Sequence, residues 1–261
     1  MVECGSEPGF DLPGWGTALM SPALSARSLC LARSHEEEWM DLPDQDPALV
    51  AECLDDLRRL NRWFGGISLT VRALDRLISD LAPGAELAIV DVATGGGDFP
   101  RAMAARAERR GLRARVLATD LNPMILGLAA RGAPRGVEFA VADARRLPFA
   151  DGSFDVATCS LMLHHLEPDD AVLVLKEMRR VARRGLIVND LVRSWIGYLG
   201  ALVVPRAMSK NPLFRHDAPL SIRRAYTRGE MSTLAARAGL GPVRFRELLG
   251  YRLTMTAEGS P

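Results

Sequence analysis

The sequence predicts an α/β fold: a doubly wound, mostly parallel sheet with helices on both faces. Between residues 86 and 190, strand-like apolar segments alternate with helical ones, which is the pattern of a parallel sheet. The first three strand-like segments close with Asp91, Asp120 and Asp143, and a glycine run follows the first of them. Because parallel strands end at one edge of a sheet, these residues should meet where such folds bind ligands.

Individual elements follow from hydrophobic periodicity and from turn residues. We expect strands at 87–92, 115–119, 137–141, 154–159 and 185–190, and helices at 99–110, 123–131 and 168–182, with a weak turn near 145. A helix at 228–239 and a closing hairpin of strands near 243–249 and 251–257 should complete a domain spanning residues 84–261.

Residues 191–227 interrupt this alternation. They contain aromatic residues, three prolines and His216. A long segment of this kind inside a compact domain is usually functional or disordered, so we expect a lid insertion here.

The N-terminal third divides into two parts. Residues 1–35 are rich in Gly, Pro and Ser, and we expect a poorly ordered tail. Residues 36–83 should form a helical cap of two helices separated by Asn61–Gly66. This cap either packs as a layer on the sheet or closes the open side of the ligand site, and both interpretations stay open.

Composition excludes several classes of protein. The net charge is +1 over 261 residues, so no basic field favours nucleic acid. Cys4, Cys30, Cys53 and Cys159 form no C-x-x-C pair, which argues against a zinc site and a disulfide framework and suits the cytoplasm. We therefore expect no metal. We also expect no transmembrane segment, because the best apolar run is about half the length of a span.

The glycine run has the properties of a site for a ligand carboxylate. Gly95 and Gly97 allow close approach of the backbone, and the following helix directs its N-terminal amides to the same place. The dinucleotide fingerprint G-x-G-x-x-G would need a third glycine where Pro100 stands, which disfavours a nicotinamide cofactor.

The aspartates indicate a nucleoside. Asp120 can accept hydrogen bonds from both ribose hydroxyls, and Asp143 can accept one from an exocyclic adenine amine. Each alone could equally be a turn residue or a helix cap. Their joint occurrence in strand order favours the nucleoside. Asp91 precedes the turn, so it should orient loop amides or a ligand ammonium group.

Four segments together resemble the class I S-adenosylmethionine-dependent methyltransferases: Val90–Asp98, Ala118–Leu121, Val141–Ala144 and Leu147–Asp155. The resemblance covers roughly residues 85–257. It implies a seven-stranded sheet with an antiparallel last strand, and S-adenosyl-L-methionine as the cofactor. The family usually has glycine where Ala93 stands, although a similar alanine occurs in its quinone-modifying branch.

The resemblance also implies roles for individual residues in binding the cofactor. Asp120 with Leu121 would hold the ribose, Asp143 with Ala144 the adenine, and the loop of Ala93, Thr94, Gly95 and Gly97, supported by Asp91, the methionine half. Ser160, just past the fourth strand, would also contact the cofactor.

The cofactor carries an activated methyl group, so the protein has mainly to align the acceptor and exclude water. His164 and His165 follow the fourth strand and are candidates for the general base. We expect one to face the pocket and the other the helix 168–182, with His165 preferred. Asn189 and Asp190 end the fifth strand and are further catalytic candidates. All four could instead satisfy backbone groups or cap turns.

Residues 191–227 should cover the acceptor pocket. The expected lining residues are Trp195, Tyr198, Leu199, Leu202, Met208, Leu213 and Phe214. Such a cover suits a flat, apolar small molecule, although the same stretch could form a homodimer surface or a membrane contact.

We therefore predict a methyltransferase of specialised metabolism acting on a small aromatic or polyketide-like acceptor, with O-methylation favoured. The alternatives are C-methylation of a quinone-like ring and a catalytically silent S-adenosylmethionine-binding module. A non-enzymatic scaffold is weaker. Methylation of nucleic-acid bases is disfavoured because Asn189-Asp190-Leu191-Val192 lacks the Pro-Pro-aromatic signature.

Overall fold

The computed structural model describes residues 31–259. Residues 1–30 and 260–261 lie outside this range, and with them most of the expected tail, Cys4 and Cys30. The described chain begins with a packed segment, since Arg33 donates hydrogen bonds to the carbonyl oxygens of Leu166 and Arg224.

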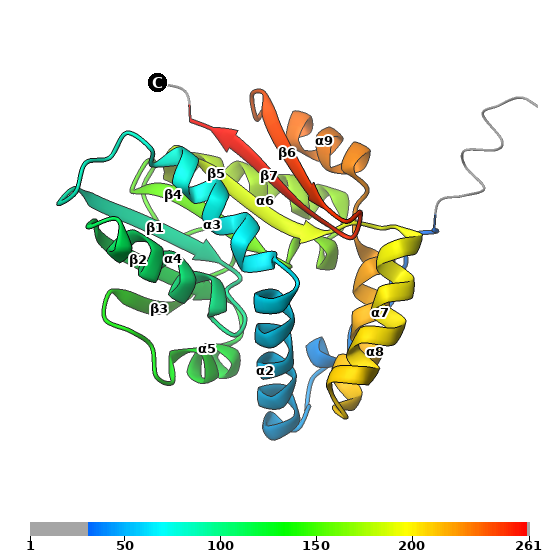
Figure 1. The fold of residues 1–261 in the computed structure, drawn as a ribbon. Coiled ribbons are helices and arrows are strands. Elements are labelled where there is room, and N and C mark those ends of the chain that lie inside the picture. Colours follow the sequence, from blue (N-terminus) through cyan, green and yellow to red (C-terminus); the bar gives the residue numbers. More distant parts are fainter. Residues whose placement is uncertain (1–30, 260–261) are drawn as a thin grey trace, which may run out of the picture. The chain divides into compact units, whose positions relative to one another are not determined.

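The sheet has seven strands in the order β3-β2-β1-β4-β5-β7-β6 (Figure 1). Their bounds are β1 Glu86–Val92, β2 Arg113–Asp120, β3 Val137–Val141, β4 Phe154–Ser160, β5 Ala182–Leu191, β6 Val243–Leu248 and β7 Arg252–Glu258. The first five strands are parallel to one another, and β7 runs antiparallel to both β5 and β6. The predicted fold class is confirmed, including the antiparallel last strand.

Helices cover both faces because side chains alternate along each strand. On one face α3 (Gly66–Leu77) and α4 (Asp98–Arg109) pack over residues such as Ile89 and Ile187. On the other face α6 (Pro168–Val181) and α9 (Arg228–Arg237) pack over Val90 and Val188. The short helix α5 (Pro123–Ala130) connects β2 to β3.

The order of strands places a ligand site between β1 and β4. The chain passes from β1 to β2 on one side, and it returns to β4 on the other side of β1. Crossover connections leave in opposite directions at this point, which opens a crevice at the carboxyl ends of the two strands.

The expected helical cap consists of α2 (Pro47–Trp63) and α3. Asp46 caps α2 by accepting a hydrogen bond from Ala48, and Gly65, at φ +77°, makes the turn between the helices. The two helices of the cap lie in different places. Whereas α3 packs on the sheet, α2 runs beside the glycine turn, where Leu54 lies 3.5 Å from the position of a Cβ on Gly96.

The insertion forms two further helices, α7 (Trp195–Met208) and α8 (Pro212–Arg224), which pack against each other (Figure 1). Ser194 caps α7 by accepting from the amide of Gly197, and Asn211 caps α8 by accepting from that of Phe214. None of the helices within residues 31–259 is both long and apolar enough to cross a membrane.

Candidate active site

The turn between β1 and α4 is built on left-handed backbone. Gly95 and Gly97 have φ of +51° and +70°, and Ala93 has φ of +53°. For a residue with a Cβ this conformation costs about 1–2 kcal/mol, which explains why the resembled family places glycine there. A Cβ placed on Gly95 would meet no described atom within 4 Å, so a ligand can approach the backbone here.

Asp91 lies beneath this turn and is fully buried. Its carboxylate accepts hydrogen bonds from the hydroxyls of Thr158 at 2.5 Å and Thr94 at 2.7 Å. Burial raises the pKa of Asp91 to about 7, against the lowering effect of the two hydroxyls. The residue therefore supports the turn from below, and its contact with a ligand ammonium group stays a prediction.

Asp120 joins the end of β2 to the glycine turn. One carboxylate oxygen accepts from the amide of Gly95 and the other from that of Asn122, both at 3.0 Å. Burial raises its pKa, while the backbone hydrogen bonds act in the opposite direction. The neighbouring Leu121 is 61% exposed at the same edge. The predicted ribose residues thus lie beside the predicted methionine loop.

The end of β3 is arranged differently. Asp143 forms an ion pair with Arg145 at 2.8 Å, and hydrogen bonding by that guanidinium lowers the pKa of Asp143. Ala144 is buried beside it. A contact between Asp143 and an adenine amine would have to share the carboxylate with Arg145, and the assigned role stays a prediction.

Ser160 supports the fit of a cofactor at this edge. Within the described part of the chain, its hydroxyl oxygen is one of four buried side-chain polar atoms without a hydrogen-bond partner. Buried hydroxyls are normally paired. Ser160 ends β4, the strand next to β1 at the crevice, so a bound cofactor could supply the missing partner.

An apolar cavity of about 300 Å³ lies next to this edge. One wall comes from α2 and another from α7 and α8. Glu38, His164, His165 and Ser221 form one polar cluster in the lining, and Tyr251 and Arg252 are further polar lining residues. The lining residues are Glu38, Met40, Leu57, Leu60, Phe64, Leu161, His164, His165, Leu191, Ile196, Gly197, Gly200, Ala201, Val204, Pro205, Ala218, Ser221, Ile222, Leu249, Tyr251 and Arg252.

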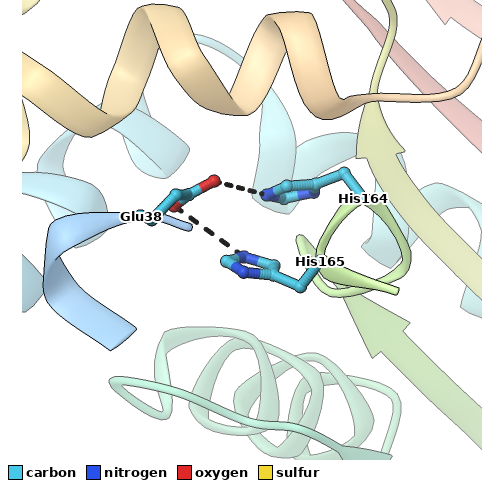
Figure 2. A group of neighbouring side chains, drawn as sticks. All are labelled: Glu38, His164 and His165. Carbon is cyan, nitrogen blue, oxygen red and sulfur yellow. Dashed lines mark ion pairs between the residues drawn. The ribbon is translucent and has the colours of Figure 1, made fainter. Parts of the chain in front are cut away.

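Glu38, His164 and His165 lie close together in this polar cluster (Figure 2). The Nε2 atom of His164 lies 3.5 Å from Oε1 of Glu38, and Nε2 of His165 lies 3.9 Å from Oε2. The two imidazole rings are 4.2 Å apart. On the far side of each ring, Nδ1 of His164 contacts Asp190 at 2.6 Å, and Nδ1 of His165 contacts Asp41 at 2.8 Å.

The carboxylates and the histidines of this cluster change one another's pKa. Burial alone would lower the pKa of His164, but Asp190 and Glu38 outweigh it and raise the pKa to about 10. Burial alone would raise the pKa of Glu38, but the two histidines lower it to about 2. At neutral pH His164 is therefore an imidazolium between two carboxylates, which makes it a poor general base.

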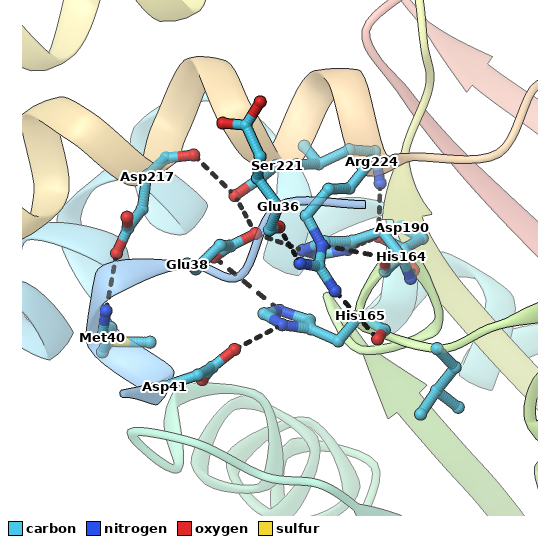
Figure 3. Close-up of polar contacts among 12 residues, drawn as sticks. Glu36, Glu38, Met40, Asp41, His164, His165, Asp190, Asp217, Ser221 and Arg224 are labelled. Carbon is cyan, nitrogen blue, oxygen red and sulfur yellow. Dashed lines mark hydrogen bonds and ion pairs between the residues drawn. The ribbon is translucent and has the colours of Figure 1, made fainter. Parts of the chain in front are cut away.

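The insertion holds this polar cluster together (Figure 3). Ser221 donates to Glu38 at 2.7 Å, and Arg224 donates to the carbonyl oxygen of His165 at 2.9 Å and also to that of Glu36. Asp217 accepts from the backbone amides of Trp39 and Met40. Helix α8 thus fixes both the segment that carries Glu38 and the histidine turn.

Several expected residues lie elsewhere. Asn189 is fully buried, donates to Thr70 and the carbonyl of Gly66, and accepts from Arg252. Neighbours in a strand face opposite sides, so only Asp190 reaches the histidines. Both histidines line the cavity, whereas we expected one of them to face α6.

The insertion lines the cavity with other residues than those expected. The inward face of α7 is formed by residues that include Gly200 and Val204, whereas Trp195 and Leu199 are 49% and 58% exposed. Phe214 is buried in a separate apolar cluster. The sequence prediction named the larger apolar side chains, because hydrophobicity alone does not show which face of a helix points inward.

Sequence reasoning also missed Glu38, Asp41, Ser221 and Arg224. No local motif surrounds them, and they become neighbours of the histidines only through tertiary packing. The acidic run Glu36-Glu37-Glu38 was the one available signal, and it resembles an ordinary start of a helix.

Comparisons with known proteins show which proteins this chain is similar to. The methyltransferase-domain family matches residues 89–185. A demethylmenaquinone methyltransferase of Beutenbergia cavernae is 33% identical over 224 residues, covering 79% of this chain and 89% of the relative. A ubiquinone/menaquinone biosynthesis C-methyltransferase UbiE of Burkholderia vietnamiensis is 31% identical over 181 residues, which cover 62% of this chain and 70% of the relative.

A solved S-adenosylmethionine-dependent methyltransferase from Aquifex aeolicus has the same fold, with a TM-score of 0.55 and 22% identity over 82% of this chain and 99% of that chain. The fold, the glycine turn with its aspartates and the length of the match to the Beutenbergia relative lead to one assignment. The chain belongs to the class I S-adenosylmethionine-dependent methyltransferases and transfers the cofactor's methyl group to a small molecule.

Proposed function

We propose that the protein methylates a ring carbon of a quinone-like acceptor in its reduced, hydroxyl-bearing form. The two relatives described above are named for menaquinone and ubiquinone methylation, and one is named a C-methyltransferase. This support favours the C-methylation alternative over the O-methylation that the sequence alone suggested.

The observation that carries the proposal is a mostly apolar cavity whose lining contains the polar cluster of Glu38, His164 and His165. Ligand pockets of this type are mostly apolar and use a few polar groups to fix orientation. A flat ring fits between the aliphatic side chains of α2 and α7, and its hydroxyl would face Glu38 and the two histidines. Leu161, directly after Ser160, lines the cavity, so the cavity adjoins the end of β4, where we predict the cofactor.

The chemistry follows from this orientation. Loss of the hydroxyl proton makes the ring electron-rich at the adjacent carbon. Bound S-adenosylmethionine would supply an activated methyl group to that carbon, with S-adenosylhomocysteine as the other product, and the ring would then lose the proton of the methylated carbon. His165 is the more exposed histidine and contacts Asp41, so we assign it to accept the hydroxyl proton. The imidazolium of His164 stabilises the developing oxyanion.

The product identifies the reaction. The enzyme is incubated with cofactor carrying a ¹³C-labelled methyl group and with matched panels of reduced quinones and simple phenols. We expect label on carbon, which ¹³C NMR separates from label on oxygen. Label on oxygen alone would refute the proposal in favour of O-methylation, and cofactor binding without turnover across both panels would favour the silent module.

A pair of glycine variants tests whether the cavity holds the acceptor. A Cβ on Gly200 or on Gly229 would meet no described atom within 4 Å, but only Gly200 lines the cavity. We expect Gly200→Leu to raise the KM for the acceptor at least tenfold while leaving cofactor affinity unchanged. Gly229→Leu should change neither. Equal KM values for the two variants would place the acceptor outside this cavity.

A further inference from the structure

We propose that Glu38, His164 and His165 bind a divalent first-row transition-metal ion in the lining of the cavity. The expectation of no metal rested on cysteine spacing, which carries no information on a His-His-Glu cluster assembled from distant parts of the chain. This inference concerns the metal-bound state, in which both histidines would be neutral ligands and would no longer have the proton-transfer and oxyanion roles assigned to them above. It does not depend on the identity of the acceptor.

The spacing of the three side chains suits a shared ion. Their candidate ligand atoms all lie within 4.8 Å of one another. The Nε2–Oε separations of 3.5 and 3.9 Å are long for charged hydrogen bonds, which are shorter than about 3 Å. Two ligands of a tetrahedral zinc ion lie roughly 3.4 Å apart, given bonds of about 2.1 Å. Little movement would therefore bring the three groups around one ion.

Hydrogen bonds behind the candidate ligands strengthen the case. Asp190 and Asp41 contact the Nδ1 atoms of His164 and His165 at 2.6 and 2.8 Å, so each Nε2 atom is left to face Glu38. Metal-binding histidines almost always have such a partner on the second ring nitrogen. The hydroxyl of Ser221 holds Oε1 of Glu38 in the same way at 2.7 Å.

The types and charges of the candidate ligands indicate which class of metal ion the site would bind. Two imidazole nitrogens and one carboxylate suit Zn²⁺, Fe²⁺, Co²⁺ or Mn²⁺, whereas Ca²⁺ and Mg²⁺ prefer oxygen ligands. The carboxylates of Glu38, Asp41 and Asp190 surround the two rings, so a dication would offset their charge. Three protein ligands would leave at least one coordination position for water or for an oxygen of the acceptor.

The test uses Co²⁺ as a spectroscopic probe on the full chain without a histidine tag, after treatment with a chelator. We expect saturable binding of one Co²⁺ per chain, with visible d–d absorption that Zn²⁺ abolishes by competition. His165→Ala and Glu38→Gln should each weaken Co²⁺ binding at least about 100-fold. Asp41→Asn should weaken it about 10- to 100-fold, because it removes the negative charge of a hydrogen-bond partner and no ligand.

His35→Ala is the matched control, since His35 is an exposed histidine that contacts Glu167. It should bind Co²⁺ like the wild type. Retained affinity for S-adenosylmethionine shows that each variant is folded, and should His165→Ala fail this check, Glu38→Gln and Asp41→Asn decide. Absence of saturable binding, or wild-type affinity in Glu38→Gln, overturns the proposal whether or not methyl transfer to a quinone-like ring is observed.

Discussion

The buried carboxyl of Asp91, beneath the glycine turn, leads to a quantitative prediction of how the free energy of unfolding depends on pH. Asp91→Asn preserves the shape of the side chain and can still hydrogen-bond the hydroxyls of Thr158 and Thr94. It removes the ability to ionise. The variant therefore isolates the effect of a buried charge beneath the glycine turn from the effect of packing.

The magnitude follows from the pKa. Burial raises the pKa of Asp91 from 3.8 to about 7 in the folded protein, despite the two hydroxyls. Between these values the folded state keeps a proton that the unfolded state has lost, so the stability of the wild type falls as pH rises through this window. One pKa unit corresponds to about 1.36 kcal/mol. From about pH 5 to about pH 7 the wild type should lose roughly 2 kcal/mol relative to Asp91→Asn.

Urea denaturation of both proteins without cofactor at several pH values measures this difference, and all other titrations cancel between them. Asp143→Asn is the control, because Arg145 lowers the pKa of Asp143 and its contribution is lost only in more acidic solution. The difference in free energy of unfolding between the wild type and Asp143→Asn should stay constant from about pH 5 to about pH 7. If the free energy of unfolding of the wild type, relative to that of Asp91→Asn, stays constant or rises with pH, Asp91 is ionised across the range. That result would refute the reasoning.

Two further predictions concern the same edge of the sheet. Asp120→Ala should weaken S-adenosylmethionine binding about 10- to 100-fold, the worth of a charged hydrogen bond, because the ribose and the amide of Gly95 both lose their acceptor; unchanged affinity by calorimetry would contradict the ribose assignment. Ala93→Gly should leave the free energy of unfolding in urea within about 1 kcal/mol of wild type, since relief of left-handed strain offsets the added flexibility of the unfolded chain. Ala93→Val should be clearly destabilising, and equal stability of the two variants would exclude strain at this position.

The fold was predictable because its signals are local. Alternating strands and helices, the aspartates at strand ends and the glycine run each lie within a few residues of one another, and together they fixed a parallel sheet and its ligand edge. The helices of the insertion were not assigned, although Ser194 and Asn211 are ordinary N-cap residues. Their signal was overlooked because prolines at 205, 212 and 219 suggested an irregular segment.

The polar cluster of the cavity was predictable only in part. His164, His165 and Asp190 follow strands, and position alone named them as candidates. Glu38 comes from the N-terminal segment and Ser221 from α8, and only packing of these segments brings them to the histidines. Sequence periodicity describes one element at a time, so it contains no information on such a junction.

The glycine turn and the walls of the cavity come from different parts of the chain, and this bears on acceptor selectivity. The family match ends at residue 185 and contains the cofactor edge and both histidines, whereas Glu38, α7 and α8 lie outside it. The apolar walls of the cavity come largely from these outer segments and from α2. Asp91, beneath the glycine turn, is buried and does not line the cavity. Changes in acceptor selectivity should therefore map mainly to α7 and α8, because these helices line the cavity, whereas α2 also runs beside the glycine turn.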